Sequence, residues 1–481
     1  MVTDWRPIRT DLIGTLGRAK APVVGNEEEE SMAGRSRKRT ALAITIMVTA
    51  AYSLVAVPQA IAAEEDREVR NQSIIISKDT QFTDVNGVRG GSGTISDPYV
   101  ISNWDVSQIR ISDTDKHFVI KNNKVDSLTL NWNGNTVDVR NNDVGDLRVN
   151  QNVRRTGGPT TGTIVNNTFG IVGQLRHFDG VFAHNTVGAT PDMMDPNRLE
   201  IPFFGNTRAV NFDGFNGAHF FDNTIFGYVE VRLHGHHHSS SYQEDSHYHG
   251  PPDEHSTHAE HSMDDPDVDH TNRFHQVWVH DNTIHASGPY ALIYTDTAHS
   301  ANDRTAASEQ NEELNKPHTH HTKVHLTGNK LIGAGMYVDI FNADDKNHTS
   351  TNRGSMDIRN NDITLLYPED QLPFQQFDGL TVWNAKDVFL RIAGNKIRYD
   401  GSGDPLEADN ENPSTSGIFL QHLKKGNVSI VDNFVENFFY GVRATDMDQT
   451  VFWTVLGLET IGVSDQVAWD ESVKNNPEMD H

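Results

Sequence analysis

An asparagine recurs in one sequence context ten times between residues 123 and 433. In every copy the residues three before and two after the asparagine are apolar, and the residue just before it is Asn, Asp, Gly or His. Period-two alternation places the residues five and three positions upstream on one face of a strand. Asparagine itself suits a tight left-handed corner and can form local amide hydrogen bonds. The ten residues are Asn123, Asn142, Asn167, Asn185, Asn223, Asn282, Asn329, Asn361, Asn395 and Asn433.

The spacing of these asparagines gives the size of the repeat. The shortest intervals are 18 residues, from Asn167 to Asn185, and 19 residues, from Asn123 to Asn142. Each interval accommodates one coil made of strand, corner, strand and turn, and stacked coils would pair their strands in parallel at about 4.8 Å. The asparagines would then form a hydrogen-bonded ladder. The sequence therefore predicts an all-β, right-handed parallel β-helix, a pectin-lyase-like solenoid of about ten or more coils. An antiparallel sandwich is the alternative, but it does not explain the repeated offset.

A short segment before the ladder carries a second signal. It contains Gly91-Ser92-Gly93-Thr94 followed by Asp97-Pro98-Tyr99. With the ladder, it resembles right-handed parallel β-helix proteins of the carbohydrate-binding/sugar-hydrolase repeat type, including NosD-like periplasmic copper-binding proteins. For the NosD-like members, the resemblance implies a role in handling copper for a partner enzyme. No copper ligand carries over, because the matching segment contains no ligand set, and the fold hosts many unrelated activities.

The chain ends and the spacing pattern suggest four regions. Residues 1–62 contain a basic stretch, an uncharged segment over 41–57 and the small-residue pattern Ala60-Ile61-Ala62, which is the order of a signal peptide, here with an extended N-region. Residues 63–114 are expected to form an N-terminal cap and the first coil. Residues 115–445 are expected to form the β-helix, and 446–481 a C-terminal cap. We expect a secreted, cell-surface or periplasmic protein, with membrane contact only if the signal stays uncleaved.

Charge and cysteine content narrow the choice of partners. The chain has 66 acidic and 40 basic residues, a net charge of −26, and no cysteine. A chain this acidic repels nucleic-acid backbones, and the absence of thiols excludes disulfides and thiolate metal sites. The expected partners are a polysaccharide or cell-wall glycan, and metal ions.

Histidines are concentrated in an insert over residues 234–273. Eighteen of the 25 histidines lie between His234 and His325, and acidic residues are interleaved with them. Imidazoles and carboxylates suit copper or zinc, so a divalent metal (Cu, Zn or Ca) is a candidate cofactor. The insert lacks the fixed spacing of a closed zinc site, and a solvated insert without metal is an equally weighted alternative. The candidate ligands are His234, His236, His238, His247, His249, His255, His258, His261 and His270.

Strand alternation predicts which side chains face outward on the middle coils. The position four residues before each ladder asparagine supplies His219, Trp278, His325, Asp357 and Arg391. The strand after the corner supplies Glu230, Arg232, Tyr337, Asp339 and Trp383. Aromatic rings can stack on sugar faces and charged groups can bind hydroxyls or uronates. The candidate substrate-binding residues are Trp278, Tyr337, Trp383, His219 and Arg232.

Two kinds of catalysis could use this surface. A polysaccharide lyase needs a cation and a base, which Arg391 (or a bound ion) and His325 would supply. A glycoside hydrolase needs two carboxylates about 5–10 Å apart, for which Glu230, Asp339 and Asp357 are available. Cross-strand ion pairs on a polar wall would explain the same residues without any ligand. The first hypothesis is an exported β-helix protein that binds an extracellular polysaccharide, with lyase-type cleavage open. The alternatives are a NosD-like metal-binding protein and a non-enzymatic cell-surface spacer or adhesin.

Overall fold

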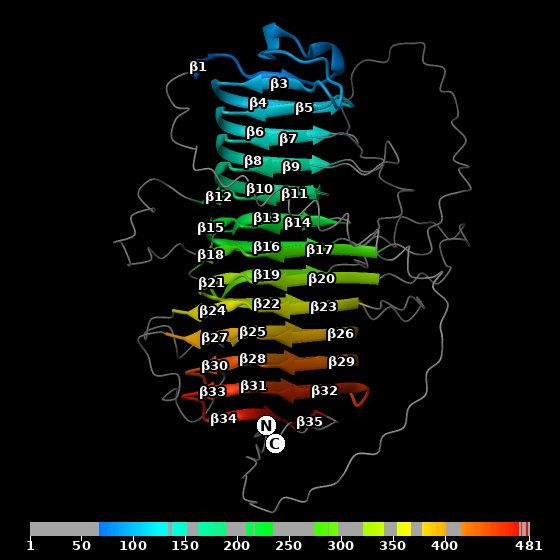
Figure 1. The fold of residues 1–481 in the computed structure, drawn as a ribbon, viewed down its shortest axis with the longest axis vertical. Coiled ribbons are helices and arrows are strands. Elements are labelled where there is room, and N and C mark those ends of the chain that lie inside the picture. Colours follow the sequence, from blue (N-terminus) through cyan, green and yellow to red (C-terminus); the bar gives the residue numbers. More distant parts are fainter. Residues whose placement is uncertain are drawn as a thin grey trace, which may run out of the picture. The chain divides into compact units, whose positions relative to one another are not determined.

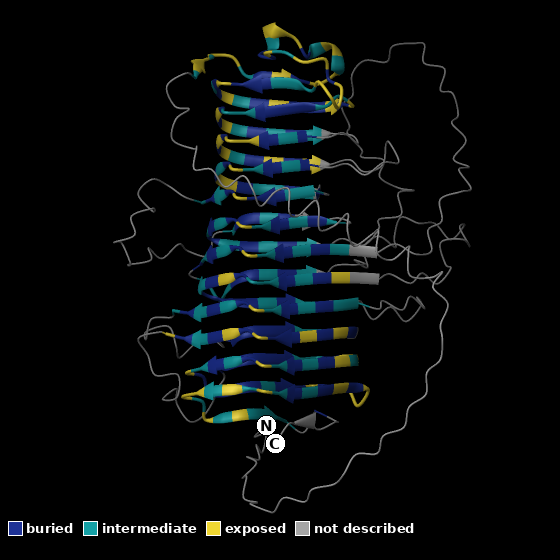
Figure 2. Ribbon diagram, viewed as in Figure 1, coloured by how far each residue is buried: buried dark blue, intermediate teal, exposed yellow. Residues whose placement is uncertain are grey.

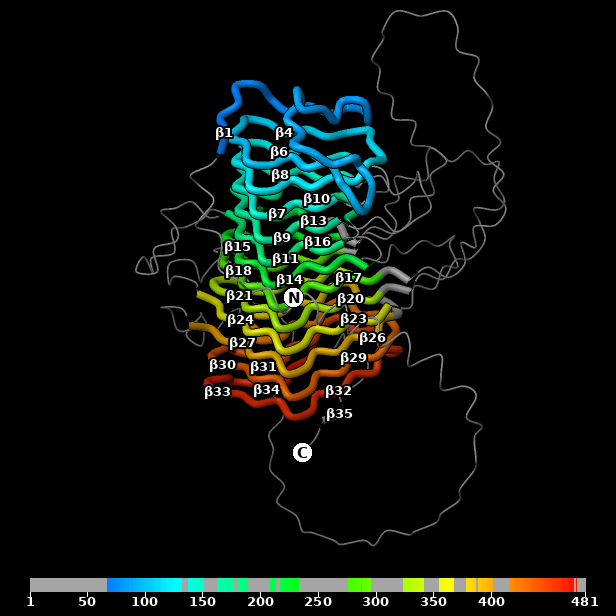
Figure 3. The backbone as a smooth tube through the Cα atoms, turned by 45° about the horizontal axis from the view of Figure 1, so that its top comes forward, coloured from blue at the N-terminus to red at the C-terminus, as the bar shows by residue number. Residues whose placement is uncertain are grey.

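The structure is a computed structural model that describes residues 67–132, 137–151, 162–178, 180–188, 208–214, 217–233, 274–286, 288–296, 321–340, 354–366, 378–400, 415–470, 473 and 478–479. These residues form an all-β parallel β-helix, in which successive coils stack in sequence order (Figures 1 and 3). The predicted fold class is confirmed. The expected signal peptide (1–62) and the His-rich insert (234–273) lie outside the described residues.

The strand that precedes each corner belongs to a 13-stranded sheet, called here the first sheet. Its neighbouring strands pair in parallel, as in Val277↔Val324 and Val324↔Met356. Its strands are β3 (Tyr99–Ser102), β5 (Phe118–Lys121), β7 (Val137–Arg140), β9 (Gly162–Val165), β11 (Gly180–Ala183), β14 (Ala218–Phe221), β17 (Phe274–His280), β20 (His321–Thr327), β23 (Gly354–Arg359), β26 (Lys386–Ala393), β29 (Lys424–Val431), β32 (Val451–Leu456) and β35 (Glu478–Met479).

The remaining strands form a second, 22-stranded sheet that holds two ladders. In the first coils one long strand serves both ladders: β4 (Trp104–Thr114), β6 (Lys124–Trp132), β8 (Asp143–Gln151) and β10 (Thr168–Phe178). Later coils have a short strand after the corner, the corner ladder: β12 (Thr186–Val187), β15 (Thr224–Phe226), β18 (Thr283–His285), β21 (Lys330–Gly333), β24 (Asp362–Leu365), β27 (Lys396–Tyr399), β30 (Phe434–Glu436) and β33 (Glu459–Ile461). A separate strand follows, the return ladder: β13 (Arg208–Gly214), β16 (Tyr228–Leu233), β19 (Tyr290–Asp296), β22 (Gly335–Asp339), β25 (Asp378–Trp383), β28 (Ser416–Gln421), β31 (Tyr440–Thr445) and β34 (Asp465–Trp469).

The core lies between the walls of the coil, and buried and exposed positions alternate along the strands (Figure 2). The rings of Phe182 and Phe220 stack on adjacent strands of the first sheet, 5.0 Å apart and 2° from parallel. Phe212 of the return ladder meets Phe220 from the other side of the core, with ring centroids 5.3 Å apart. Because inward side chains of the first sheet and the return ladder meet, the outward side chains of these two walls point to opposite sides.

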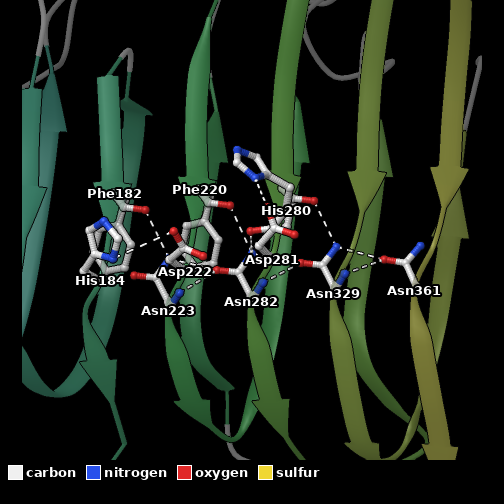
Figure 4. A network of polar contacts seen from close by, with 11 residues as sticks. Phe182, His184, Phe220, Asp222, Asn223, His280, Asp281, Asn282, Asn329 and Asn361 are labelled. Atoms are coloured by element: carbon white, nitrogen blue, oxygen red, sulfur yellow. Dashed lines mark hydrogen bonds and ion pairs between the residues drawn. The ribbon is translucent and has the colours of Figure 1, made fainter. Parts of the chain in front are cut away.

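The asparagine ladder is continuous from Asn123 to Asn433. At each step the backbone N–H and Nδ2 of one asparagine donate to Oδ1 of the next, at 2.9 and 3.0 Å for Asn123 and Asn142. Nδ2 also donates to a backbone carbonyl of the preceding coil, as from Asn282 to Phe220 at 3.0 Å (Figure 4). All ten side chains are buried. The ladder therefore satisfies its own amides, as the predicted repeat requires.

The left-handed corner falls on the residue before each asparagine and not on the asparagine itself. Asn122, His184 and Asp281 have φ of 58°, 56° and 56°, whereas none of the ten ladder asparagines has a positive φ. The expectation that the ladder asparagine turns the corner is therefore wrong. Asn, Asp, Gly and His are the residues that tolerate this conformation best, which explains why only these four types precede the ladder position.

The N-terminal end is closed by strands β1 (Glu68–Val69) and β2 (Ile74–Ile76) and by two 3-10 turns, η1 (Asp79–Gln81) and η2 (Asp84–Asn86). Trp104 anchors this end: its Nε1 donates to the Gly87 carbonyl at 2.8 Å, and the Arg89 guanidinium lies 3.6 Å from its ring centroid. None of the helical segments in the described part of the chain has the length and apolarity needed to cross a bilayer.

The coils continue past residue 445, where a separate C-terminal cap was expected to begin. β32 pairs in parallel with β29, β33 with β30 and β34 with β31. Gly457 (φ 59°) takes the left-handed position and Leu458 stands where the ladder asparagine would be. The sequence pattern therefore placed the end of the β-helix too early, because the corner at Gly457 and Leu458 forms without a ladder asparagine.

Candidate functional site

The first predicted row forms one column on the outward face of the first sheet. His219, Trp278, His325, Asp357 and Arg391 are register partners on the consecutive strands β14, β17, β20, β23 and β26. We call these five residues the His219 column. The alternation of inward and outward residues and the fixed position four residues before each ladder asparagine were sufficient to predict this column.

Trp278 is stacked between two imidazoles within this column. Its ring lies 4.3 Å from the His219 ring at 4°, and 5.7 Å from the His325 ring at 6°. Phe221 and His280 form a similar stack on the same face, at 4.8 Å and 5°. Both faces of the Trp278 indole are therefore covered by protein, and only its edge is left for a ligand. Stacking of a sugar on this ring face, as the sequence suggested, is not available.

The predicted lyase pair does not meet in the column. His325 and Arg391 are separated by the intervening strand β23, which places them about 10 Å apart along the solenoid axis. Asp357 lies between them and is held by Arg359, with Nε 2.7 Å from Oδ1, while His325 Nδ1 is 3.9 Å from Asp357 Oδ2. Burial lowers the pKa of His325, partly offset by the Asp357 carboxylate. A neutral imidazole is compatible with a base, but the neutralising cation is too far away to share one sugar unit.

Burial of another residue of this column, His219, predicts a pH dependence of folding. Burial, reinforced by the nearby His280 and His325, lowers the pKa of His219 to about 4 from an ordinary value of 6.5. As the pH falls from 6.5 to 4, the unfolded chain gains this proton before the folded protein does, so the free energy of unfolding decreases. His219→Phe keeps a ring in the stack and removes the titration. Between pH 7 and pH 4.5 the melting temperature of this variant should fall by a few degrees less than that of the unmodified protein. An identical decrease in both proteins would contradict the assignment.

The second predicted set lies on the return ladder and thus on the opposite wall. Glu230 and Arg232 are on β16, Tyr337 and Asp339 on β22, and Trp383 on β25. The ten candidate residues therefore form two separate surfaces. The sequence could not show this, because it does not reveal which inward faces meet in the core.

Glu230 is held in an ion-pair network. Its side chain is 13% exposed, Arg208 Nη1 donates to it at 2.7 Å, and Arg232 Nε donates at 2.7 Å. Burial alone would raise the pKa of Glu230, but the two guanidinium groups outweigh it and hold that pKa below its ordinary value. A carboxylate stabilised in this way is a poor proton donor. The pair of Glu230 with Arg208 thus ties β16 to the neighbouring strand β13, and Arg232 pairs with Glu230 within β16.

The predicted hydrolase carboxylates do not form a pair. Glu230 and Asp339 are two coils apart, about 10 Å along the axis, and offset by two residues along the strand. Asp357 is on the other wall. Since one of the three acids is paired with two arginines and the others face opposite sides, no two of them match the arrangement of a glycosidase acid and its partner.

Three of the predicted residues do come together at the end of the return-ladder strands. Asp339 and Trp383 are register partners on β22 and β25, and Tyr337 lies two residues from Asp339 on the same outward face. Asn384 Nδ2 donates to Asp339 Oδ1 at 3.4 Å, and His422 meets the Trp383 ring edge to face at 4.9 Å. We call these five residues the Trp383 cluster.

Asp339 and Tyr337 of the Trp383 cluster have pKa values shifted toward their protonated forms. Burial raises the pKa of Asp339, in spite of hydrogen bonds from Asn384 and Tyr337. Burial and the Asp339 charge raise the pKa of Tyr337, whose ring lies 5.0 Å from that of Tyr290. Groups perturbed in this way gather at binding and catalytic sites more often than elsewhere.

Sequence reasoning missed Asn384, His422 and Tyr290. Asn384 and His422 follow directly after return-ladder strands, so extending the outward rows by one residue beyond each strand would have found them. Tyr290 is the first residue of β19, and it is the contact between its ring and that of Tyr337 that brings it to the cluster.

Metal binding remains a sequence prediction. Within the described part of the chain, no three His, Asp or Glu residues are grouped so that they could hold an ion. The predicted ligands from His234 to His270 lie outside the described residues.

Comparison with known proteins adds no assignment. No family model matches the chain, and neither a curated protein nor a solved structure matches it.

Proposed function

We propose that this protein binds an extracellular glycan along the outward wall of the return ladder, centred on the Trp383 cluster. The observation that carries the proposal is the position of Trp383. Its ring is half-buried, has an edge-to-face contact with His422, and is in register with the carboxyl group of Asp339. Unlike Trp278, it is not sandwiched between two rings of the adjacent strands.

The neighbouring polar groups suit sugar hydroxyls. The Asp339 carboxyl, the Asn384 amide and the Tyr337 hydroxyl supply donors and acceptors beside the indole. An aromatic platform flanked by such groups combines apolar contact with directed hydrogen bonds. The repeat of the coil, about 4.8 Å, extends this wall along one direction, which favours a chain-like ligand over a compact one.

Binding fits this surface better than cleavage does. The lyase pair His325 and Arg391 is separated by a coil, and the three candidate hydrolase acids do not pair. We therefore expect the glycan to be recovered intact after incubation with the protein. Polysaccharide cleavage, detected as new reducing ends or as absorbance of unsaturated products, would overturn this part of the proposal.

The binding test uses the full chain and affinity electrophoresis against alginate, pectate, cellulose, xylan and glycosaminoglycans. We expect retardation by at least one glycan and a loss of about tenfold in affinity for Trp383→Ala, the size expected for removal of an aromatic contact and its buried area. Thr163→Ala, an outward residue on the first sheet, is the matched control and should bind normally. Normal retardation of Trp383→Ala, or retardation by none of these glycans, would contradict the proposal.

A further inference from the structure

Two phenylalanines are exposed in one column of the first sheet, two coils apart. Phe389 on β26 is 57% exposed and Phe452 on β32 is 69% exposed. Phe389 pairs with Asn427 of β29, and Asn427 pairs with Phe452. At the usual strand spacing the two phenylalanines are about 10 Å apart along the axis. No other phenylalanine that the structure describes has a side chain this exposed to solvent.

Rings on this face of the sheet stack when they occupy successive coils. His219 and Trp278 do so at 4.3 Å, and Phe221 and His280 at 4.8 Å, each pair within 5° of parallel. In the Phe389 column the middle coil carries Asn427, which has no ring. The two phenylalanines are therefore two ring-stacking distances apart along the axis, which leaves room between them for one ring from outside the chain.

A cation and two hydroxyls line one side of this interval. Arg391 lies two residues after Phe389 on the same outward face, and its register partners are Ser429 and then Thr454. Arg391 is exposed and makes no ion pair with any side chain that the structure describes. A guanidinium with unused donors is suited to bind a carboxylate through two parallel hydrogen bonds.

We propose that Phe389, Asn427, Phe452 and Arg391 form a binding site, the Phe389 slot, for a single ring that bears a carboxylate. The ring inserts between the two phenyl groups above Asn427, and the carboxylate pairs with Arg391. A sugar acid and an aromatic acid share this chemistry. The slot lies on the wall opposite the Trp383 cluster, so the proposal does not rest on the proposed function.

The test is a calorimetric titration of the full chain with D-glucuronate and with 2-naphthoate, each compared with its neutral counterpart, D-glucose and 2-naphthylmethanol. We expect one saturable site for at least one acid, and the acid that binds identifies the source of the ring. Phe452→Ala should weaken binding of that acid about tenfold. Arg391→Gln should weaken it about fivefold or more and leave the weaker binding of the neutral counterpart unchanged.

A filled-slot variant separates loss of binding from loss of folding. Asn427→Phe places a third phenyl between the other two, and cross-strand aromatic neighbours stabilise a sheet. This variant should keep or raise the melting temperature and abolish binding of the acid. Trp383→Ala, on the other wall, should bind the acid normally. Saturable binding of neither acid, or unchanged binding in both Phe452→Ala and Asn427→Phe, would overturn the proposal.

Discussion

Asn282→Ala is expected to lower the free energy of unfolding by about 3–6 kcal/mol, a large part of the 5–15 kcal/mol typical of a folded domain. Asn282 Oδ1 accepts from the backbone N–H of Asn223 at 3.1 Å and from its Nδ2 at 2.9 Å. Its own Nδ2 donates to Asn329 Oδ1 at 2.9 Å and to the Phe220 carbonyl at 3.0 Å. The side chain is 1% exposed. Alanine leaves these buried donors and acceptors without partners, and water cannot replace them.

The effect should be measured by urea denaturation followed by circular dichroism, and located by hydrogen exchange. Each coil of a solenoid contacts only its neighbours, so the loss of protection should be concentrated in β14, β17 and β20. Asn150→Ala on β8 is the control, because Asn150 is exposed and should cost less than about 0.5 kcal/mol. Equal losses for Asn282→Ala and Asn150→Ala would show that the ladder amides contribute no more than surface residues do.

Phe220→Ala should lower the free energy of unfolding by about 3–5 kcal/mol. Its ring is fully buried and stacks on Phe182 at 5.0 Å, and it contacts Phe212 of the return ladder at 5.3 Å. Its removal opens a cavity where the first sheet meets the return ladder, and the hydrogen-bonded strands on both sides cannot move together to fill it. The melting temperature and the urea midpoint should both decrease.

Phe389→Ala is the matched control for this prediction. Phe389 is also on the first sheet but points outward and is 57% exposed, so its loss should cost less than about 1 kcal/mol. If the two substitutions destabilised the protein equally, the assignment of inward and outward faces would be wrong.

Much of the fold could be predicted from the ladder, and the errors have local causes. The offset of ten asparagines predicts the register that pairs Trp278 with His325. The repeat did not reveal which of two adjacent residues has the left-handed backbone, because Asn282 and Asp281 are both of types that tolerate that conformation. It missed the coil after residue 445, since Leu458 replaces the asparagine there. It also missed the split of the second strand into two ladders, because corner strands such as β12 have two residues and show no period.

The candidate sites were only partly predictable. Alternation correctly placed His219, Trp278 and His325 in one outward column, but side-chain rotation decides that their rings cover one another. The exposed Phe389 and Phe452 were missed, although the same alternation, read two residues further from the corner, points to them.

The sequence by itself determined the all-β repeat, the asparagine column and the alternation of inward and outward residues, because these depend on neighbours along one strand and on a constant offset from each corner. Only the tertiary structure decided that the two outward rows lie on opposite walls, that Glu230 is bound by Arg208, and that Trp383 lies beside Asp339. These relations depend on which inward faces meet across the core and on how side chains from different coils orient, and neither is encoded in the period of a single strand.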